Sequence, residues 1–311
     1  MMEISNASKS NAGVNVNDTF NIISLKDAEP DAVIGFYDKF GDASQKSIRS
    51  KLTTSTGHYK CNGAVALSTA GEIVGVYLGI PQRLLANPTL KAAQSVDTLI
   101  APSCRGSGLI KKLAEFHFAI LEEAGIECIF GVPNKLFEQI TYKRLGWNMS
   151  RQTYRYIVFL PSPLLWLLHL SVLKADRSNV SDNSEDRGMQ PPKLTEAEKD
   201  LLNMKAGYEI VTGFGCLAVI KRNRYKTQIG MIRCNRKCSG LDRFKFLALL
   251  AAQSPVSLLL SYATSESPTA QFLKPFSIYQ KSLHFSGRLL GVRRGASFGE
   301  QYLEYLEYDT F

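Results

Sequence analysis

Residues 96–110 read Val-Asp-Thr-Leu-Ile-Ala-Pro-Ser-Cys-Arg-Gly-Ser-Gly-Leu-Ile, and this stretch decides the fold. Its β-branched and aliphatic start favours a strand, which ends at Pro102 because proline has no amide hydrogen for a sheet. Arg105-Gly-Ser-Gly108 then allows a sharp turn in which several amide groups point the same way. A strand, a glycine turn and a helix start in succession predict a cradle for a phosphate or pyrophosphate group.

Apolar residues recur at helical spacing after the turn, and Gly125 suits the end of that helix. We expect further strands and helices in this half, with strands at 20–25, 64–68, 73–80, 90–100, 127–132 and 154–160 and helices at 29–40, 45–52 and 135–144. Such an order predicts an α/β protein with mixed strand directions. The cradle then lies at the carboxyl end of a central strand, where open α/β sheets bind ligands.

The second half of the chain repeats this alternation. A capping box at Thr195–Glu198 opens a helix. The elements expected after it are strands at 216–220, 226–233, 256–262, 283–291 and 302–308 and helices at 241–252 and 269–280. Their order matches the later part of the first half, but no Arg-Gly-x-Gly turn follows these strands. We therefore predict a second copy of the fold that lacks the cradle.

The charge balance favours an anionic partner. Lysine and arginine number 37 against 28 acidic residues, a formal net charge of +9. A phosphorylated cofactor, a nucleic acid or a membrane surface would each satisfy this charge. No aromatic stripe is interleaved with the basic residues, so we expect no nucleic-acid partner.

The six cysteines show no pattern typical of metal binding. No Cys-x-x-Cys occurs, and Cys234-x-x-x-Cys238 is the nearest approach to a zinc motif, without a histidine pair to complete it. We expect no metal, and free thiols in a reducing compartment. The polar N-terminus also lacks the pattern of a signal peptide, so we expect a cytoplasmic protein.

The first half resembles the GNAT superfamily of acyl-CoA-dependent N-acyltransferases. That family's motif is Arg/Gln-x-x-Gly-x-Gly/Ala, and Arg105–Ile110 matches its first and fourth positions but ends on Ile110 rather than a small residue. Downstream, Gly131-Val-Pro-Asn134 and Tyr142-Lys-Arg-Leu-Gly-Trp147 resemble the family's asparagine and its Tyr-x-x-x-Gly-aromatic box. With the second copy included, the chain resembles tandem GNAT acyltransferases and, more distantly, Fem-type peptidoglycan aminoacyltransferases.

The resemblance implies two GNAT-like mixed-sheet domains packed in tandem, and a cofactor bound once per chain, acetyl-CoA or another acyl-CoA. The cradle amides would hold the CoA pyrophosphate, and the strand before it would pair with the pantetheine arm. The residues implied in cofactor binding are Leu99, Ile100, Ala101, Arg105, Gly106, Ser107, Gly108, Leu109, Ile110 and Asn134.

Acyl transfer to an amine needs a base for the amine proton, a donor to the developing oxyanion and an acid for the leaving thiolate. The resemblance places Tyr142 as the acid, with an ordinary packing role as the alternative. Asp97 is the one carboxylate in its strand and is a candidate base, or else it bonds to loop amides. The C-terminal carboxylate of Phe311 is another candidate base. We expect the Cys104 thiol to take no part in the reaction. We expect His117 to be a packing residue.

Domain boundaries follow from composition. We expect a disordered tail at 1–18, the GNAT domain at 19–160, an apolar segment and linker at 161–193, and the degenerate copy at 194–311. Residues 157–173 are apolar, but prolines leave an uninterrupted part of about ten residues, short of the roughly 20 that span a bilayer. We expect no membrane span, with peripheral membrane contact through 157–173 as the alternative.

The predicted function is an N-acyltransferase, in particular an acetyltransferase, acting on an amino sugar or other small amine by direct transfer in a ternary complex. The acceptor would lie in the cleft between the halves. Two alternatives stay open: a Fem-like aminoacyltransferase of cell-wall metabolism that uses charged tRNA, and a non-catalytic acyl-CoA-binding protein. The oligomeric state is not predicted.

Overall fold

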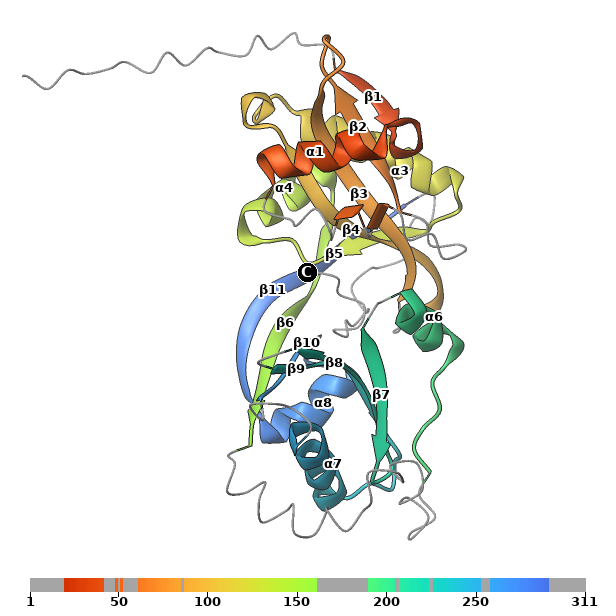
Figure 1. Cartoon of the computed structure of the whole chain (residues 1–311), viewed down its shortest axis with the longest axis vertical. Helices are drawn as coiled ribbons and strands as arrows, with labels where there is room; N and C mark the ends of the chain where they lie inside the picture. Colours follow the sequence, from red (N-terminus) through yellow and green to blue (C-terminus); the bar gives the residue numbers. More distant parts are fainter. Residues whose placement is uncertain are drawn as a thin grey trace, which may run out of the picture.

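The computed structural model describes residues 20–41, 48–49, 51–52, 61–84, 87–160, 190–204, 207–223, 226–252 and 258–290. Their strands are hydrogen-bonded in one continuous order, β1-β2-β3-β4-β5-β11-β6-β10-β9-β8-β7. Figure 1 shows two curved, helix-covered halves of this sheet stacked along the long axis of the molecule. The expected α/β fold with two mixed sheets in tandem is confirmed.

The first half consists of β1 (Asn21–Ser24), η1 (Leu25–Asp27), α1 (Pro30–Phe40), β2 (Asn62–Leu67), β3 (Ile73–Leu84), β4 (Asn87–Ile100), η3 (Pro102–Cys104), α3 (Leu109–Glu123), β5 (Cys128–Gly131), α4 (Lys135–Leu145) and β6 (Asn148–Phe159). Strands β1 to β4 are antiparallel neighbours, whereas β4 and β5 run parallel. The parallel step is made through α3, whose apolar face packs on the sheet.

The second half consists of α6 (Glu196–Met204), β7 (Tyr208–Gly213), β8 (Cys216–Asn223), β9 (Lys226–Cys234), α7 (Gly240–Ala252), β10 (Leu258–Thr264), α8 (Pro268–Leu273), η5 (Lys274–Phe276) and β11 (Ile278–Leu289). Its first three strands form an antiparallel meander, and β9 and β10 run parallel. This repeats the arrangement of β2 to β5, so the second half is a structural copy of the first.

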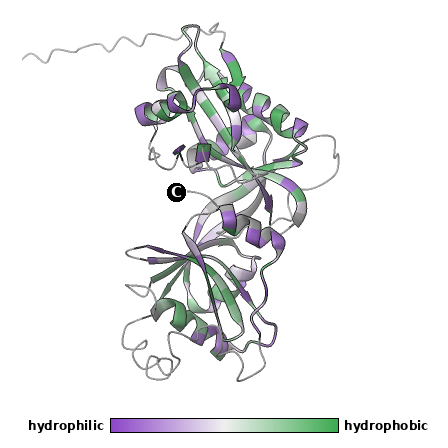
Figure 2. Cartoon of the chain, turned by 45° about the vertical axis from the view of Figure 1, so that its right-hand side comes forward, coloured by the Kyte–Doolittle hydropathy of each residue, from purple (hydrophilic) through white to green (hydrophobic). Residues whose placement is uncertain are grey.

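The two halves exchange their last strands. Strand β11 lies between β5 and β6, and β6 lies between β11 and β10. The closing strand of each half is therefore built into the sheet of the other half. Both halves keep their own apolar core, and Figure 2 shows apolar residues concentrated in the strands of each.

Some elements differ from those expected. The helix expected at 269–280 is wrong: α8 ends at Leu273, and β11 begins at Ile278. Pro275 lies between them and removes an amide hydrogen that a longer helix would need. Strand β7 was not expected, although it pairs with β8 along its whole length. Strand β6 begins six residues earlier than expected because its polar start pairs with β11.

Several expectations fall outside the described residues. They concern the tail at 1–18, most of the helix at 45–52, residues 161–189 of the apolar segment and linker, the strand at 302–308 and the carboxylate of Phe311. Within the described ranges, no helix combines the length and the apolar character needed to cross a membrane.

Candidate functional site

A β-bulge interrupts β4 shortly before the glycine turn. The register between β3 and β4 shifts by one residue here, so that Tyr77 is faced by both Asp97 and Thr98. Asp97 adopts a φ of 42°, a left-handed conformation that few non-glycine residues take. Bulges redirect side chains and end regular pairing, and they concentrate near functional sites. The bulge therefore turns Asp97 out of the regular strand.

Two side chains from outside the sheet hold this bulge. The hydroxyl of Tyr37, on α1, donates a hydrogen bond to the backbone oxygen of Asp97. Burial, together with the nearby Asp97 charge, raises the pKa of the Tyr37 phenol well above its ordinary value, so the phenol stays a donor. The Lys51 ammonium lies 2.6 Å from Oδ2 of Asp97, and both side chains are largely buried. The carboxylate is thus fixed in direction.

Strands β4 and β5 separate just below the bulge. They pair only along Ala92–Gln94, opposite residues 128–130, and β5 then ends at Gly131. Strand β4 continues to Ile100 with β3 on one side only. Along this stretch the other edge of β4 has no strand partner in the described chain. An extended ligand could pair there with the β4 backbone, as an added strand would.

The glycine turn forms the predicted cradle at the end of β4. Gly106 and Gly108 have φ values of 86° and 80°, and a Cβ placed on either would meet nothing within 4 Å. Ser107 Oγ closes the turn by donating to the Cys104 oxygen at 2.7 Å, and Arg105 Nε donates to the Ile100 oxygen at 3.3 Å. Helix α3 begins directly after Gly108, without an acidic residue in its first turn.

This geometry suits an anion. The first amide groups of a helix have no partner within it, and the helix dipole places positive potential at that end. The open space beside both glycines lets a phosphate approach the backbone. Open backbone amides at the start of a helix are an arrangement that can accept a phosphate or pyrophosphate group.

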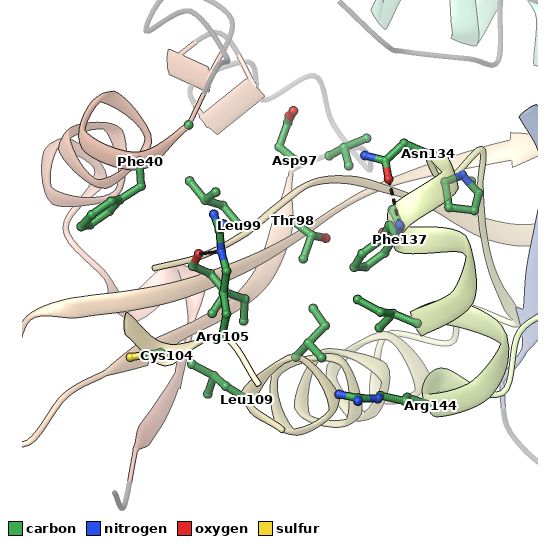
Figure 3. A pocket seen from close by; sticks show the side chains of 18 of the residues that line it. Phe40, Asp97, Thr98, Leu99, Cys104, Arg105, Leu109, Asn134, Phe137 and Arg144 are labelled. Atoms are coloured by element: carbon green, nitrogen blue, oxygen red, sulfur yellow. Dashed lines mark hydrogen bonds between the residues drawn. The ribbon is translucent and has the colours of Figure 1, made fainter. Parts of the chain in front are cut away.

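A cavity of about 1090 Å³ joins the cradle to the space between β4 and β5. Its walls come from α1, the bulged part of β4, the cradle, residues 131–134 and α4 (Figure 3). Nine of the residues singled out from the sequence line it, namely Asp97, Leu99, Ile100, Arg105, Gly106, Gly108, Leu109, Ile110 and Asn134.

Ala101 and Ser107 do not belong to the cavity wall. The Ala101 amide donates to the Val74 oxygen at 2.9 Å, and its carbonyl accepts from the Cys104 amide at 2.9 Å. Ser107 is committed to the turn through the same Cys104 residue. Both residues shape the cradle from behind, and Ala101 has no amide hydrogen left for a ligand.

Asn134 is the N-cap of α4. Its Oδ1 accepts a hydrogen bond from the Phe137 amide at 2.8 Å, which leaves the side-chain NH₂ as the donor available to a ligand. Figure 3 shows Asn134 at the edge of the cavity, with Phe137 beside it. Tyr142 lies on the same helix, between the lining residues Ile140 and Arg144. Its side chain is outside the described part of the structure.

The cavity is electropositive. The ionisable side chains in its wall include Lys51, Arg105 and Arg144 against the single carboxylate of Asp97. Sequence reasoning missed Arg144, although its place inside the Tyr-x-x-x-Gly box was an available signal. It also missed Lys51 and Tyr37, which no sequence pattern connects to Asp97.

The surroundings of two further side chains of this half, a thiol and an imidazole, give neither a role in the reaction. Cys104 is buried in the cavity wall, with its sulfur 3.8 Å from the Ser103 hydroxyl. His117 is fully buried away from the cavity and lies 2.8 Å from Asn62 through its Nε2. Burial lowers the pKa of His117 to about 3, so the ring is neutral and packs, as expected.

Comparison with known proteins agrees with this geometry. A family model described as an acetyltransferase (GNAT) domain matches residues 22–150. No curated protein sequence matches the chain.

Several solved structures share the fold over both halves. A GCN5-related N-acetyltransferase from Kribbella flavida matches with a TM-score of 0.55 and 12% identity, over 86% of this chain and 72% of that one. A tandem GNAT protein from the clavulanic acid biosynthesis pathway matches with a TM-score of 0.51 and 11% identity, over 89% of this chain and 100% of that one.

A third match is a GCN5-related glucosamine N-acetyltransferase region in a fungal multi-domain GH3 β-N-acetylglucosaminidase. Its TM-score is 0.56 at 14% identity, over 92% of this chain and 40% of that one. This chain thus spans less than half of the fungal protein. At such identities the three structures establish the shared fold and no more.

Proposed function

We propose that the protein transfers the acetyl group of acetyl-CoA to the primary amine of a small molecule, because residues 22–150 match a family model described as an acetyltransferase (GNAT) domain. One observation carries this proposal: the open edge of β4, the bulge at Asp97 and the glycine cradle line one continuous cavity. Acetyl-CoA would supply an activated thioester at that place. The protein's part is to bind, orient and move protons.

The cofactor would lie along the open edge of β4. The cradle amides from Gly106 to Leu109 hold the pyrophosphate, since the Arg105 amide donates to the Pro102 oxygen, and the side chains of Arg105 and Arg144 add positive charge. Ile100 offers backbone groups to the pantetheine arm, whereas the backbone of Leu99 pairs with Val76 of β3 and its side chain lines the cavity. The NH₂ group of Asn134 donates to the arm from the other side. The thioester then comes to rest near the bulge.

Two side chains would carry the proton transfers. Asp97 takes the amine proton through Oδ1, since its Oδ2 is held by Lys51 at 2.6 Å. Tyr142, on the helix that walls the cavity, gives a proton to the departing thiolate, for which a phenol is a suitable donor. The amine attacks directly, in a ternary complex, and Cys104 takes no part.

An amino sugar is the favoured acceptor class. The fungal structure that shares the fold is a glucosamine N-acetyltransferase region. The Asp97 carboxylate would attract a cationic amine to a cavity that is otherwise positive. We propose that the acceptor amine lies beside the bulge, where Asp97 lines the cavity.

The first experiment asks whether the chain binds and uses acetyl-CoA. Thermal shift against acetyl-CoA, longer acyl-CoAs and free nucleotides should show stabilisation by the CoA species. Release of free CoA should then be followed with a panel of amino sugars, aminoglycosides and simple amines. Absence of stabilisation by every CoA species would refute the proposal. Stabilisation without turnover on any amine would favour a non-catalytic acyl-CoA-binding protein, and Tyr142→Phe would then change nothing.

A matched pair of glycine variants tests the cradle itself. Gly108→Glu places a carboxylate against the pyrophosphate and should weaken acetyl-CoA binding about 100-fold or more. Gly71→Glu is the control, because Gly71 has nearly the same φ, 79°, and equally open surroundings, but lies in the β2–β3 turn. If the two variants bound acetyl-CoA with equal affinity in calorimetric titration, the cofactor site would have to lie elsewhere.

A further inference from the structure

Three cysteine sulfur atoms meet in the second half of the molecule. The Sγ atoms of Cys216, Cys234 and Cys238 all lie within 4.8 Å of one another, and those of Cys216 and Cys238 are 3.9 Å apart. Cys216 and Cys238 are buried, and Cys234 is half-buried. Among the described residues this is the one group of three such potential metal ligands that comes together.

Cys216 follows the turn between β7 and β8, and the pairing of β8 with β9 brings it to Cys234. The two residues of that turn, Phe214 and Gly215, have φ values of 51° and 70°, as tight hairpin turns require. Cys216 and Cys234 then face each other directly across β8 and β9. The Asn235 amide donates to the Gly215 oxygen at 2.9 Å, which makes the cysteines a closely spaced, non-hydrogen-bonded pair.

A short turn returns Cys238 to the same point. The Lys237 amide donates to Asn235 Oδ1 at 3.1 Å, and the Cys238 amide donates to the Asn235 oxygen at 3.0 Å. Helix α7 begins directly afterwards, at Gly240. Three separate elements are thus pinned so that their thiols converge.

We propose that Cys216, Cys234 and Cys238 form a structural site for a soft divalent cation, Zn²⁺ above all. Tetrahedral Zn²⁺ with bonds of about 2.3 Å holds its sulfur ligands about 3.8 Å apart. The separation of 3.9 Å between Cys216 and Cys238 is already of this size. A disulfide would need sulfurs about 2 Å apart and would leave the third thiol without a partner.

The place of this cluster in the fold supports a structural role. Two of its residues, Cys234 and Cys238, lie at the end of β9 and before α7, and the glycine cradle lies between β4 and α3, the corresponding elements of the first half. At this position the first half presents backbone amides to an anion, whereas the second half brings three thiols together. A metal would tie the hairpin turn, the end of β9 and the start of α7 together.

Metal binding is balanced by the release of three thiol protons to solvent. In the metal-free protein Cys238 donates to the Phe214 and Gly215 oxygens at 3.3 Å, and binding gives these bonds up. Three thiolates and one Zn²⁺ carry a net charge of −1. Arg243, on the first turn of α7, lies within electrostatic range of Cys234, and its buried Nε has no hydrogen-bond partner among the described residues. Three thiolates fill three of the four tetrahedral positions, and we assign the fourth to a solvent molecule, since Cys234 is only half-buried.

The test uses the full chain, purified under reducing conditions without a histidine tag. After loading with Zn²⁺ and dialysis, elemental analysis should find one zinc per chain. Co²⁺ in its place should give the near-ultraviolet charge-transfer absorption of thiolate ligands. Chelation should lower the melting temperature, and added Zn²⁺ should restore it.

Variants decide whether these thiols are the ligands. Cys234→Ser should lose the bound metal and the cobalt–thiolate absorption, and its melting temperature should no longer respond to chelator. Cys61→Ala, at a buried thiol in the first half, should keep all three properties. Metal retained in Cys234→Ser, or less than a tenth of an equivalent in the loaded wild type, would overturn the proposal. So would cobalt binding without thiolate absorption. Cys234→Ala would replace the serine variant if that variant did not fold.

Discussion

Asp97 combines an unusual backbone with a carboxylate in the cavity wall. Its φ of 42° is tolerated best by glycine, asparagine and aspartate. Asparagine therefore keeps the bulge and removes only the charge and the basicity. This makes Asp97→Asn a clean test of the proposed proton transfer.

Asp97→Asn should leave acetyl-CoA binding nearly unchanged and lower kcat about 100-fold or more, the usual size of a general-base contribution. The measurement is steady-state release of free CoA together with calorimetric titration of the cofactor. Asp31→Asn is the control, because Asp31 forms an exposed ion pair with Arg49 and does not line the cavity. A kcat close to that of the wild type would show that Asp97 shapes the bulge and is not the base.

The buried His117 makes stability depend on pH. Its pKa in the folded protein is about 3, below the ordinary value of about 6.5 in the unfolded chain. The unfolded state therefore binds more protons, and stability that is complete above pH 6.5 is lost as the pH falls toward 3. At pH 5 the loss amounts to roughly 2 kcal/mol.

His117→Gln should remove this pH dependence while keeping a donor toward Asn62. The melting temperature of the wild type should fall more between pH 7 and pH 5 than that of the variant. Parallel curves for the two proteins would show that another group is responsible.

Single residues could be predicted from the sequence where their role depends on their own backbone conformation and on their neighbours in the chain. The cradle glycines could be recognised because only glycine takes their positive φ easily. The partners of Asp97 could not. Lys51 and Tyr37 reach the bulge through tertiary packing across some 46 and 60 residues of chain, which leaves no periodic trace.

At the scale of elements, the start of α4 links stability and binding. Asn134 caps this helix through Oδ1 and presents its NH₂ group as a donor at the edge of the cavity. Aspartate would keep the cap and add a favourable charge at the helix start, but would lose the donor. The two roles of Asn134 can therefore be separated.

Asn134→Asp should melt at or above the wild-type temperature and bind acetyl-CoA about tenfold more weakly, the effect of losing one hydrogen bond of about 1.4 kcal/mol. Asn134→Ala should lose both the cap, at about 1 kcal/mol, and the affinity. Thermal melting and calorimetric titration report the two quantities. Undiminished affinity in Asn134→Asp would leave Asn134 as a helix cap only.

Elements with a strong local signal were predicted well. Helix α3 followed from its apolar spacing, and α6 from the capping box, in which Thr195 and Glu198 exchange hydrogen bonds of 2.8 and 3.3 Å. The helix after Ser267 was extended too far, because the apolar spacing continues past Pro275 into β11. There the proline and the pairing with β6 override the helical pattern.

At the scale of the whole molecule, the strand exchange was beyond sequence reasoning. Alternating apolar residues indicate a strand but not its neighbour, and β11 pairs with strands more than a hundred residues earlier in the chain. The thiol cluster was missed for the same reason. The register of β8 and β9, rather than any Cys-x-x-Cys spacing, brings Cys216 to Cys234.

The exchange has a thermodynamic consequence. Phe285, on β11, is fully buried against Phe130, on β5, with ring centroids 5.8 Å apart. If the second half unfolded alone, β11 would leave the first half and expose this contact together with the edges of β5 and β6. We therefore expect the two halves to unfold as one cooperative unit rather than as two domains.

Phe246→Ala tests this at a distance from the cavity. Phe246 is fully buried in the core of the second half, so its truncation should cost about 3–5 kcal/mol. In a cooperative unit, hydrogen exchange through global unfolding should accelerate equally in β4 of the first half and in β9 of the second.

Leu113→Ala, in the core of the first half, is the reciprocal experiment and should accelerate exchange in both strands in the same way. Calorimetry should show a single transition for the wild type and both variants. Independent domains would instead give faster exchange only in the half that carries the substitution, because nothing would oblige the other sheet to open with it.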